Sequence, residues 1–189
     1  MYRGTGYVAP VVKLEFGARS TGEPHAPMPV KCDMEGHIDG ITFPQATPVV
    51  MSLARTFWEK ATAAHVYCAQ GRIRGERYAR HWHDLIAIAN SHQFQAVMNS
   101  ADVAAAVARH KRWFFAEKDA DGREIDYQQA VSGRLCLVPK NAARHALAED
   151  YHAMAADNVL LGNGMAFDDL MSRCTTLQDA LNEAMRQHE

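Results

Sequence analysis

The chain has 189 residues, of which 48% are hydrophobic, so it can bury the core of one compact unit or two small lobes and is not expected to be disordered. Twenty basic and 22 acidic side chains give a net charge of −2, which excludes a global attraction to nucleic acid or membrane, so any basic site must be local. The four cysteines form no Cys-x-x-Cys pair, which argues against a zinc knuckle or a disulfide framework and predicts reduced thiols.

The first predicted element is a strand at 11–19, VVKLEFGAR, in which apolar and charged residues alternate. Period two places Lys13 and Glu15 together on one face. Two interpretations remain open: the pair is the solvent side of a half-buried sheet, or Glu15 stands beside a cleft and holds a divalent cation. Loops rich in Gly and Pro follow, with short strand candidates at 30–33 and 48–51.

Ser52 is a plausible N-cap for a first helix, and its apolar side contains an unexpected lysine. Lys60 lies between Phe57 and Ala61 on that side, whereas Arg55 and Thr62 are predicted on the opposite, polar side together with Glu59. A lysine this central on an apolar face usually needs an anionic partner or borders a cavity. The pattern therefore predicts a partner or cavity at Lys60.

A second helix is predicted at about 75–90, with its aromatic and aliphatic residues on one side. Arg80 and Asp84 are spaced i, i+4, which is compatible with a simple surface ion pair or with a functional site. His81 and His83 form a His-x-His triplet. Residues two apart on a helix point in nearly opposite directions, so this pair is not expected to share one metal ion.

The remainder is predicted to be helical, with a short helix and turn at 91–100 and helices at 101–117, 141–157 and 167–185. Residues 134–139 are predicted to form either a short strand or an extended link. The end of the 101–117 helix joins basic residues to Trp113, Phe114 and Phe115. These rings either stack on a nucleotide or a single strand, or form a packed aromatic end with solvated basic neighbours.

Three motifs together resemble the AbiEii/AbiGii toxin family of nucleotidyltransferases. They are the strand VKLEFGAR, the helix RTFWEKATAAH and the helix ARHWHDL, which occur in the order and with the approximate spacing of that family's later motifs. The stretch HKRWFFAEKDADG and the Leu-Val-Pro and Ala-Glu-Asp-Tyr segments are also similar, so the resemblance covers nearly the whole chain. Each motif is short, and only their ordered combination is specific.

The resemblance implies an α+β protein with a small, partial nucleotidyltransferase-like β-sheet followed by a helical C-terminal lobe. It implies a sheet region at 1–51 and a helical region at 52–189 that packs on the sheet. It assigns catalytic roles to Lys60 and Asp84 and a metal-binding role to Glu15. Lys13, Arg80 and His81 would line or support the nucleotide pocket.

The implied reaction moves a nucleotidyl group from a nucleoside triphosphate, with Mg²⁺, to an RNA such as tRNA or to a protein acceptor. A cognate antitoxin is the implied protein partner. The family's Asp-x-Asp strand has no counterpart after Gly4 and Thr5, so the chain is expected to correspond to the part of the fold that follows this motif. The alternative is a catalytically inactive relic that acts as a binding module. No membrane span or secretory leader is visible, which predicts a cytoplasmic location.

Overall fold

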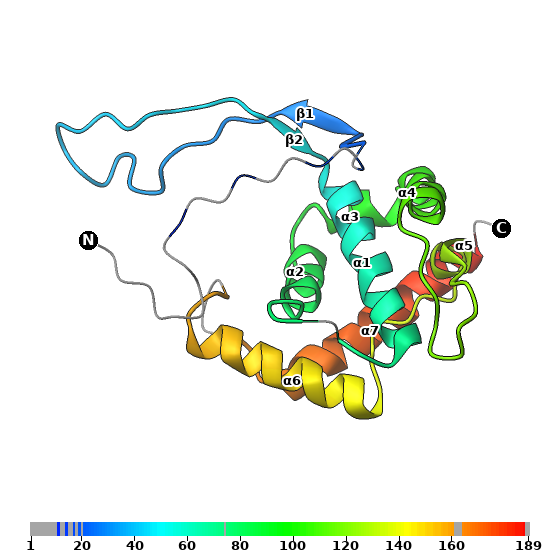
Figure 1. Cartoon of the computed structure of the whole chain (residues 1–189). Coiled ribbons are helices and arrows are strands. Elements are labelled where there is room, and N and C mark those ends of the chain that lie inside the picture. Colours follow the sequence, from blue (N-terminus) through cyan, green and yellow to red (C-terminus); the bar gives the residue numbers. More distant parts are fainter. Residues whose placement is uncertain are drawn as a thin grey trace.

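The computed structural model describes residues 11, 14, 17, 19, 21–73, 75–160 and 164–187. Within them, seven helices and a two-stranded antiparallel sheet form a mixed α+β fold, which confirms the predicted class. Figure 1 shows the hairpin at one end of the helical part, with the loop between its strands extending away from the helices. Most of the strand predicted at 11–19, including Lys13 and Glu15, lies outside the described residues.

The sheet consists of β1 (His25–Pro27) and β2 (Val49–Met51), with Ala26 opposite Val50. β2 lies where the sequence predicts it. The strand predicted at 30–33 is wrong, because only a single bridge pairs Val30 with Ala46. His-Ala-Pro has little strand propensity of its own, so β1 exists because β2 pairs with it.

The helix α1 (Leu53–Gln70) is central to the helical part, as Figure 1 shows. It begins where predicted, since the Ser52 side chain accepts a hydrogen bond from the backbone N–H of Arg55, and it ends at Gly71, whose φ is 63°. The helices that contact it are α2 (Arg80–Ala89), α3 (Phe94–Met98), α4 (Ala101–Phe114) and α5 (Tyr127–Val131).

Packing around α1 also covers its polar side. Arg55 and Thr62 were predicted on the polar side of this helix, and they are 3% and 0% exposed. That side is not left in water, because neighbours cover α1 on several sides, whereas an amphipathic pattern assumes one face in water. The Thr62 hydroxyl is satisfied within the helix, donating to the carbonyl of Trp58 at 2.6 Å.

The remaining helices largely follow the predicted ranges. α2 begins later than expected because residues 75–79 form a turn in which Arg77 has a φ of 63°. Two backbone N–H groups of that turn, from Arg77 and Ala79, donate to the Asp150 carboxylate at 2.6 and 2.7 Å. Asp150 belongs to α6 (Asn141–Ala156), which packs on α7 (Phe167–Arg186). A neighbouring helix thus provides the anionic cap that α2 lacks locally.

The segment 134–140 is an extended link and contains no strand, which decides between the two alternatives left open by the sequence. Its backbone groups bond to side chains from other elements. Leu135 exchanges two hydrogen bonds with the Asn182 side chain, at 2.7 and 2.9 Å. The Leu137 carbonyl accepts from the indole of buried Trp82 at 2.6 Å, and the Leu137 N–H donates to Gln178 at 2.8 Å. Because its polar groups are paired, the link can lie in the core.

Candidate functional site

Lys60 meets an anionic partner, as its place on the apolar face of α1 predicts. Its ammonium Nζ lies 2.7 Å from the Oδ2 of Asp84 on α2, and the two side chains are 21% and 38% exposed. Asp84 therefore pairs with Lys60 on the neighbouring helix. The simple Arg80–Asp84 surface pair considered from the sequence is not the contact that the structure makes.

The hydrogen bond to Asp84 leaves part of the Lys60 ammonium available for further hydrogen bonds. An ammonium has three N–H groups, and the bond to Asp84 uses one of them. Asp84 fixes the position of Nζ, and its other oxygen, Oδ1, lies 3.4 Å from the Nδ1 of His83. The arrangement holds a positive charge at the edge of the helical core, where water only partly screens it.

His81 lies beside this pair but carries no charge at neutral pH. Burial lowers the pKa of His81 to about 4, and the positive charges of Lys60, Arg80 and Lys111 act in the same direction. Its ring stacks near Tyr67, with centroids 6.5 Å apart. Its buried Nδ1 atom has no hydrogen-bond partner within the described part of the chain. His81 thus contributes shape and a neutral polar atom to the site.

A second charged cluster, which the sequence interpretation missed, joins α1 to α4 and to the hairpin. Arg55 donates to the Glu23 carbonyl at 2.6 Å and to the Glu59 carboxylate at 3.0 Å. Lys111 lies 3.4 Å from the other Glu59 oxygen and donates to the Glu59 carbonyl at 2.8 Å. Burial lowers the pKa of Lys111 despite the opposing effect of Glu59. The i, i+4 spacing of Arg55 and Glu59 was the available signal.

The basic and aromatic end of α4 does not form the packed aromatic end that was one of the two interpretations of the sequence. Instead Trp113, Phe114 and Phe115 are 78%, 52% and 41% exposed, while Lys111 is 9% exposed. Lys111 is buried because its ammonium pairs with the Glu59 carboxylate on α1. The side chains of Trp113, Phe114 and Phe115 then lie at the surface.

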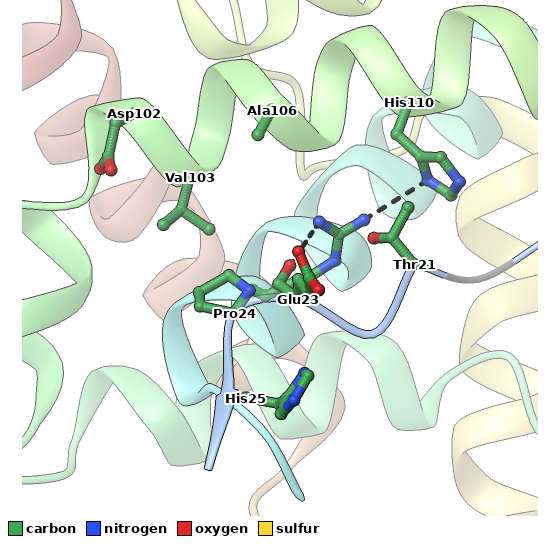
Figure 2. A pocket seen from close by; sticks show the side chains of 9 residues that line it. Thr21, Glu23, Pro24, His25, Asp102, Val103, Ala106 and His110 are labelled. Carbon is green, nitrogen blue, oxygen red and sulfur yellow. Dashed lines mark hydrogen bonds between the residues drawn. The ribbon is translucent and has the colours of Figure 1, made fainter.

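A pocket of about 610 Å³ opens between the base of the hairpin and α4, as Figure 2 shows. Thr21, Glu23 and His25 line one wall, and Asp102 and His110 line the other. Arg55 lies between them and approaches the Nδ1 of His110 at 3.4 Å. Among the predicted site residues that the structure describes, Lys60, Arg80, His81 and Asp84 do not line this pocket, so its volume alone does not identify it as the catalytic centre.

The described residues do not provide a magnesium site. No three His, Cys, Asp or Glu side chains within residues 21–73, 75–160 and 164–187 lie close enough to hold a metal ion. Asp84 is committed to Lys60, and Mg²⁺ prefers several oxygen ligands. Glu15, the predicted metal ligand, and Lys13 lie outside the described residues, so their roles remain predictions.

No described helix is long and apolar enough to cross a membrane.

Residues 1–173 match the family model described as nucleotidyl transferase AbiEii toxin of a type IV toxin–antitoxin system. No curated protein and no solved structure matches the chain.

Proposed function

Because the chain belongs to the AbiEii nucleotidyl transferase toxin family, we propose that it transfers a nucleotidyl group from a nucleoside triphosphate to an RNA or protein acceptor. The observation that supports this proposal most directly is the bond between Lys60 and Asp84, which holds a partly buried ammonium in place. A fixed positive charge of this kind is what a departing pyrophosphate requires.

In the proposed mechanism, Lys60 contacts the phosphates of the bound triphosphate with the N–H groups that Asp84 leaves available. The charge on the phosphate oxygens grows as the bond to the leaving pyrophosphate lengthens, and the ammonium stabilises that charge. Asp84 either holds Nζ in position or orients the acceptor hydroxyl. Arg80, exposed at the first turn of α2, adds a phosphate contact, and neutral His81 supports the pocket wall.

The proposal also includes a metal ligand, a further phosphate contact and a protein partner. Glu15 would be the acidic ligand for Mg²⁺, and Lys13 would be a further phosphate contact. The family description names a toxin–antitoxin system, which supports a cognate antitoxin as partner. A cytoplasmic location would give the protein its nucleoside triphosphates. Abortive infection, in which a toxin stops the growth of an infected cell, would be the biological setting.

Activity is tested by incubating the protein with each α-labelled nucleoside triphosphate, Mg²⁺ and total RNA or total protein. Label should appear in one acceptor fraction with one preferred nucleotide, and chelation of the metal should abolish it. The alternative function, an inactive binding module, predicts no label with any of the four nucleotides.

The role of Lys60 is tested by Lys60→Ala, which should lower label transfer about 100-fold or more, the effect of losing one transition-state donor. The cost in stability should stay below about 1 kcal/mol, because the ion pair is partly exposed. Lys31→Ala, at a lysine that is 58% exposed on the hairpin loop, is the matched control and should transfer label normally. A Lys60→Ala protein that unfolds would show that the ion pair is structural.

A further inference from the structure

Two cysteines far apart in sequence meet at a second pocket. Cys68 lies one turn after His65 on α1, and the Nδ1 of His65 accepts the backbone N–H of Cys136 at 3.1 Å. Cys68 and Cys136 both line a pocket of about 390 Å³, together with Lys140 and small residues around the start of α6. Both thiols are half-buried, so a small molecule that enters this pocket reaches them.

The two thiols line the same pocket and are not equivalent. Their mutual interaction lowers the pKa of Cys136 and raises that of Cys68, and the charge of Lys140, which lines the same pocket, also favours the Cys136 thiolate. Burial further raises the pKa of Cys68. Cys136 is therefore the nucleophile of the pair, since the thiolate is the reactive form. Cys174, which is fully buried and has a raised pKa, is the unreactive neighbour.

The segment that carries Cys136 is held in place on both sides. Its neighbours Leu135 and Leu137 are 3% and 0% exposed, and side chains of α2 and α7 bond to their backbone groups. Cys68 is fixed by α1. Because both backbones are anchored, the thiols stay close together without a conformational search, which favours the second step of disulfide formation.

We propose that Cys68 and Cys136 form a dithiol modification site that reacts with a low-molecular-weight disulfide and closes to an intramolecular Cys68–Cys136 disulfide. This proposal does not depend on the nucleotidyl transfer proposed above.

The reaction proceeds by two exchanges. The Cys136 thiolate attacks one sulfur of the small disulfide, whose S–S bond breaks, so that a mixed disulfide forms and one small thiolate leaves. Cys68 then gives up its proton and attacks the Cys136 sulfur, which releases the second small thiolate. The two protein thiols are oxidised, and the small disulfide is reduced to two thiols.

The test treats the folded full chain with oxidised glutathione, unfolds it in denaturant, blocks the remaining thiols with N-ethylmaleimide and maps the peptides by mass spectrometry. The expected product is a crosslinked peptide containing Cys68 and Cys136, with Cys32 and Cys174 alkylated. A crosslink between Cys68 and Cys174, or modification of Cys32 alone, would overturn the proposal.

Variants at Cys68, with a control at Cys174, separate the roles of the thiols. Cys68→Ser should trap glutathione on Cys136, because the resolving thiol is missing, and should do so about tenfold faster than Cys32 reacts. Cys174→Ser is the matched control and should form the crosslink as the unmodified chain does. Cys68→Ala repeats the first variant without a hydroxyl, in case serine disturbs α1, and circular dichroism checks that each protein is folded. An unmodified Cys136 in folded Cys68 variants would refute the assignment.

Discussion

The hairpin arm, residues 21–51, and the helical part that follows are held together by different interactions. The helical part buries large side chains completely, among them Trp58 and Trp82 at 0% exposure. In the arm, apolar residues such as Val30, Ile41 and Val49 are more than half exposed. The arm is fixed at its base, where the Ser52 N–H donates to the Pro24 carbonyl at 2.8 Å and Arg55 holds the Glu23 carbonyl. The stability of the helical part thus depends on the burial of large side chains, whereas the position of the arm depends on a few polar contacts to α1.

Trp82→Ala should have the largest effect, lowering the free energy of unfolding by about 3 to 5 kcal/mol. The change empties a fully buried site and removes the only side-chain hydrogen bond given to the Leu137 carbonyl within the described residues. Chemical denaturation measures it. Trp113→Ala, at a tryptophan that is 78% exposed, is the control and should change stability by less than about 1 kcal/mol.

Arg55→Met should cost about 3 kcal/mol and loosen the arm, because it removes a buried charge that bonds to both Glu59 and the hairpin base. Limited trypsin digestion should cut within the arm faster than in the unmodified chain. Arg109→Met, at an exposed arginine of α4, should leave both stability and cleavage unchanged. An arm that stays equally protected in Arg55→Met would show that β1 and β2 need no anchor.

Low pH should decrease the free energy of unfolding of the helical part, because His65 is protonated more readily in the unfolded chain. Burial lowers its pKa from 6.5 to about 4, so the unfolded chain binds more protons between these values and stability falls as pH drops through that window. The loss should approach about 1.4 kcal/mol per pH unit for this one histidine, and His81 adds to it. Denaturation curves from pH 7 to about pH 4 measure the slope. His65→Gln keeps a hydrogen-bond acceptor for Cys136 but does not titrate, so its curve should be flatter.

Ile41→Ser should have the smallest effect, within about 0.5 kcal/mol, because Ile41 is 54% exposed in the arm. The same substitution in α2, Ile86→Ser, replaces a side chain that is 3% exposed and should cost more than about 3 kcal/mol. Thermal denaturation of the two variants side by side compares the regions directly. Similar losses in both would mean that the arm is packed in solution.

The accuracy of the predictions from sequence also differs between the helical part and the hairpin arm. Helices with one exposed face, such as α6 and α7, are predicted almost to the residue, because their apolar stripes report the packing face directly. The strand placed at 30–33 fails because strand formation depends on a partner, and β1 forms where β2 pairs with it. One of the two interpretations of the α4 end placed Lys111 in solvent, and only the nearby Glu59 makes its burial favourable.

The sequence by itself determined the mixed α+β class, the start of α1 at Ser52, the need for a partner at Lys60 and the resemblance to the AbiEii family. The tertiary structure decided which groups meet: Lys60 with Asp84, Arg55 with Glu59 and the hairpin, and Cys68 with Cys136. The reason is that periodicity describes one helix at a time. The contacts of a central helix such as α1 depend on what each of its neighbours presents to it, and that information is distributed over the whole chain.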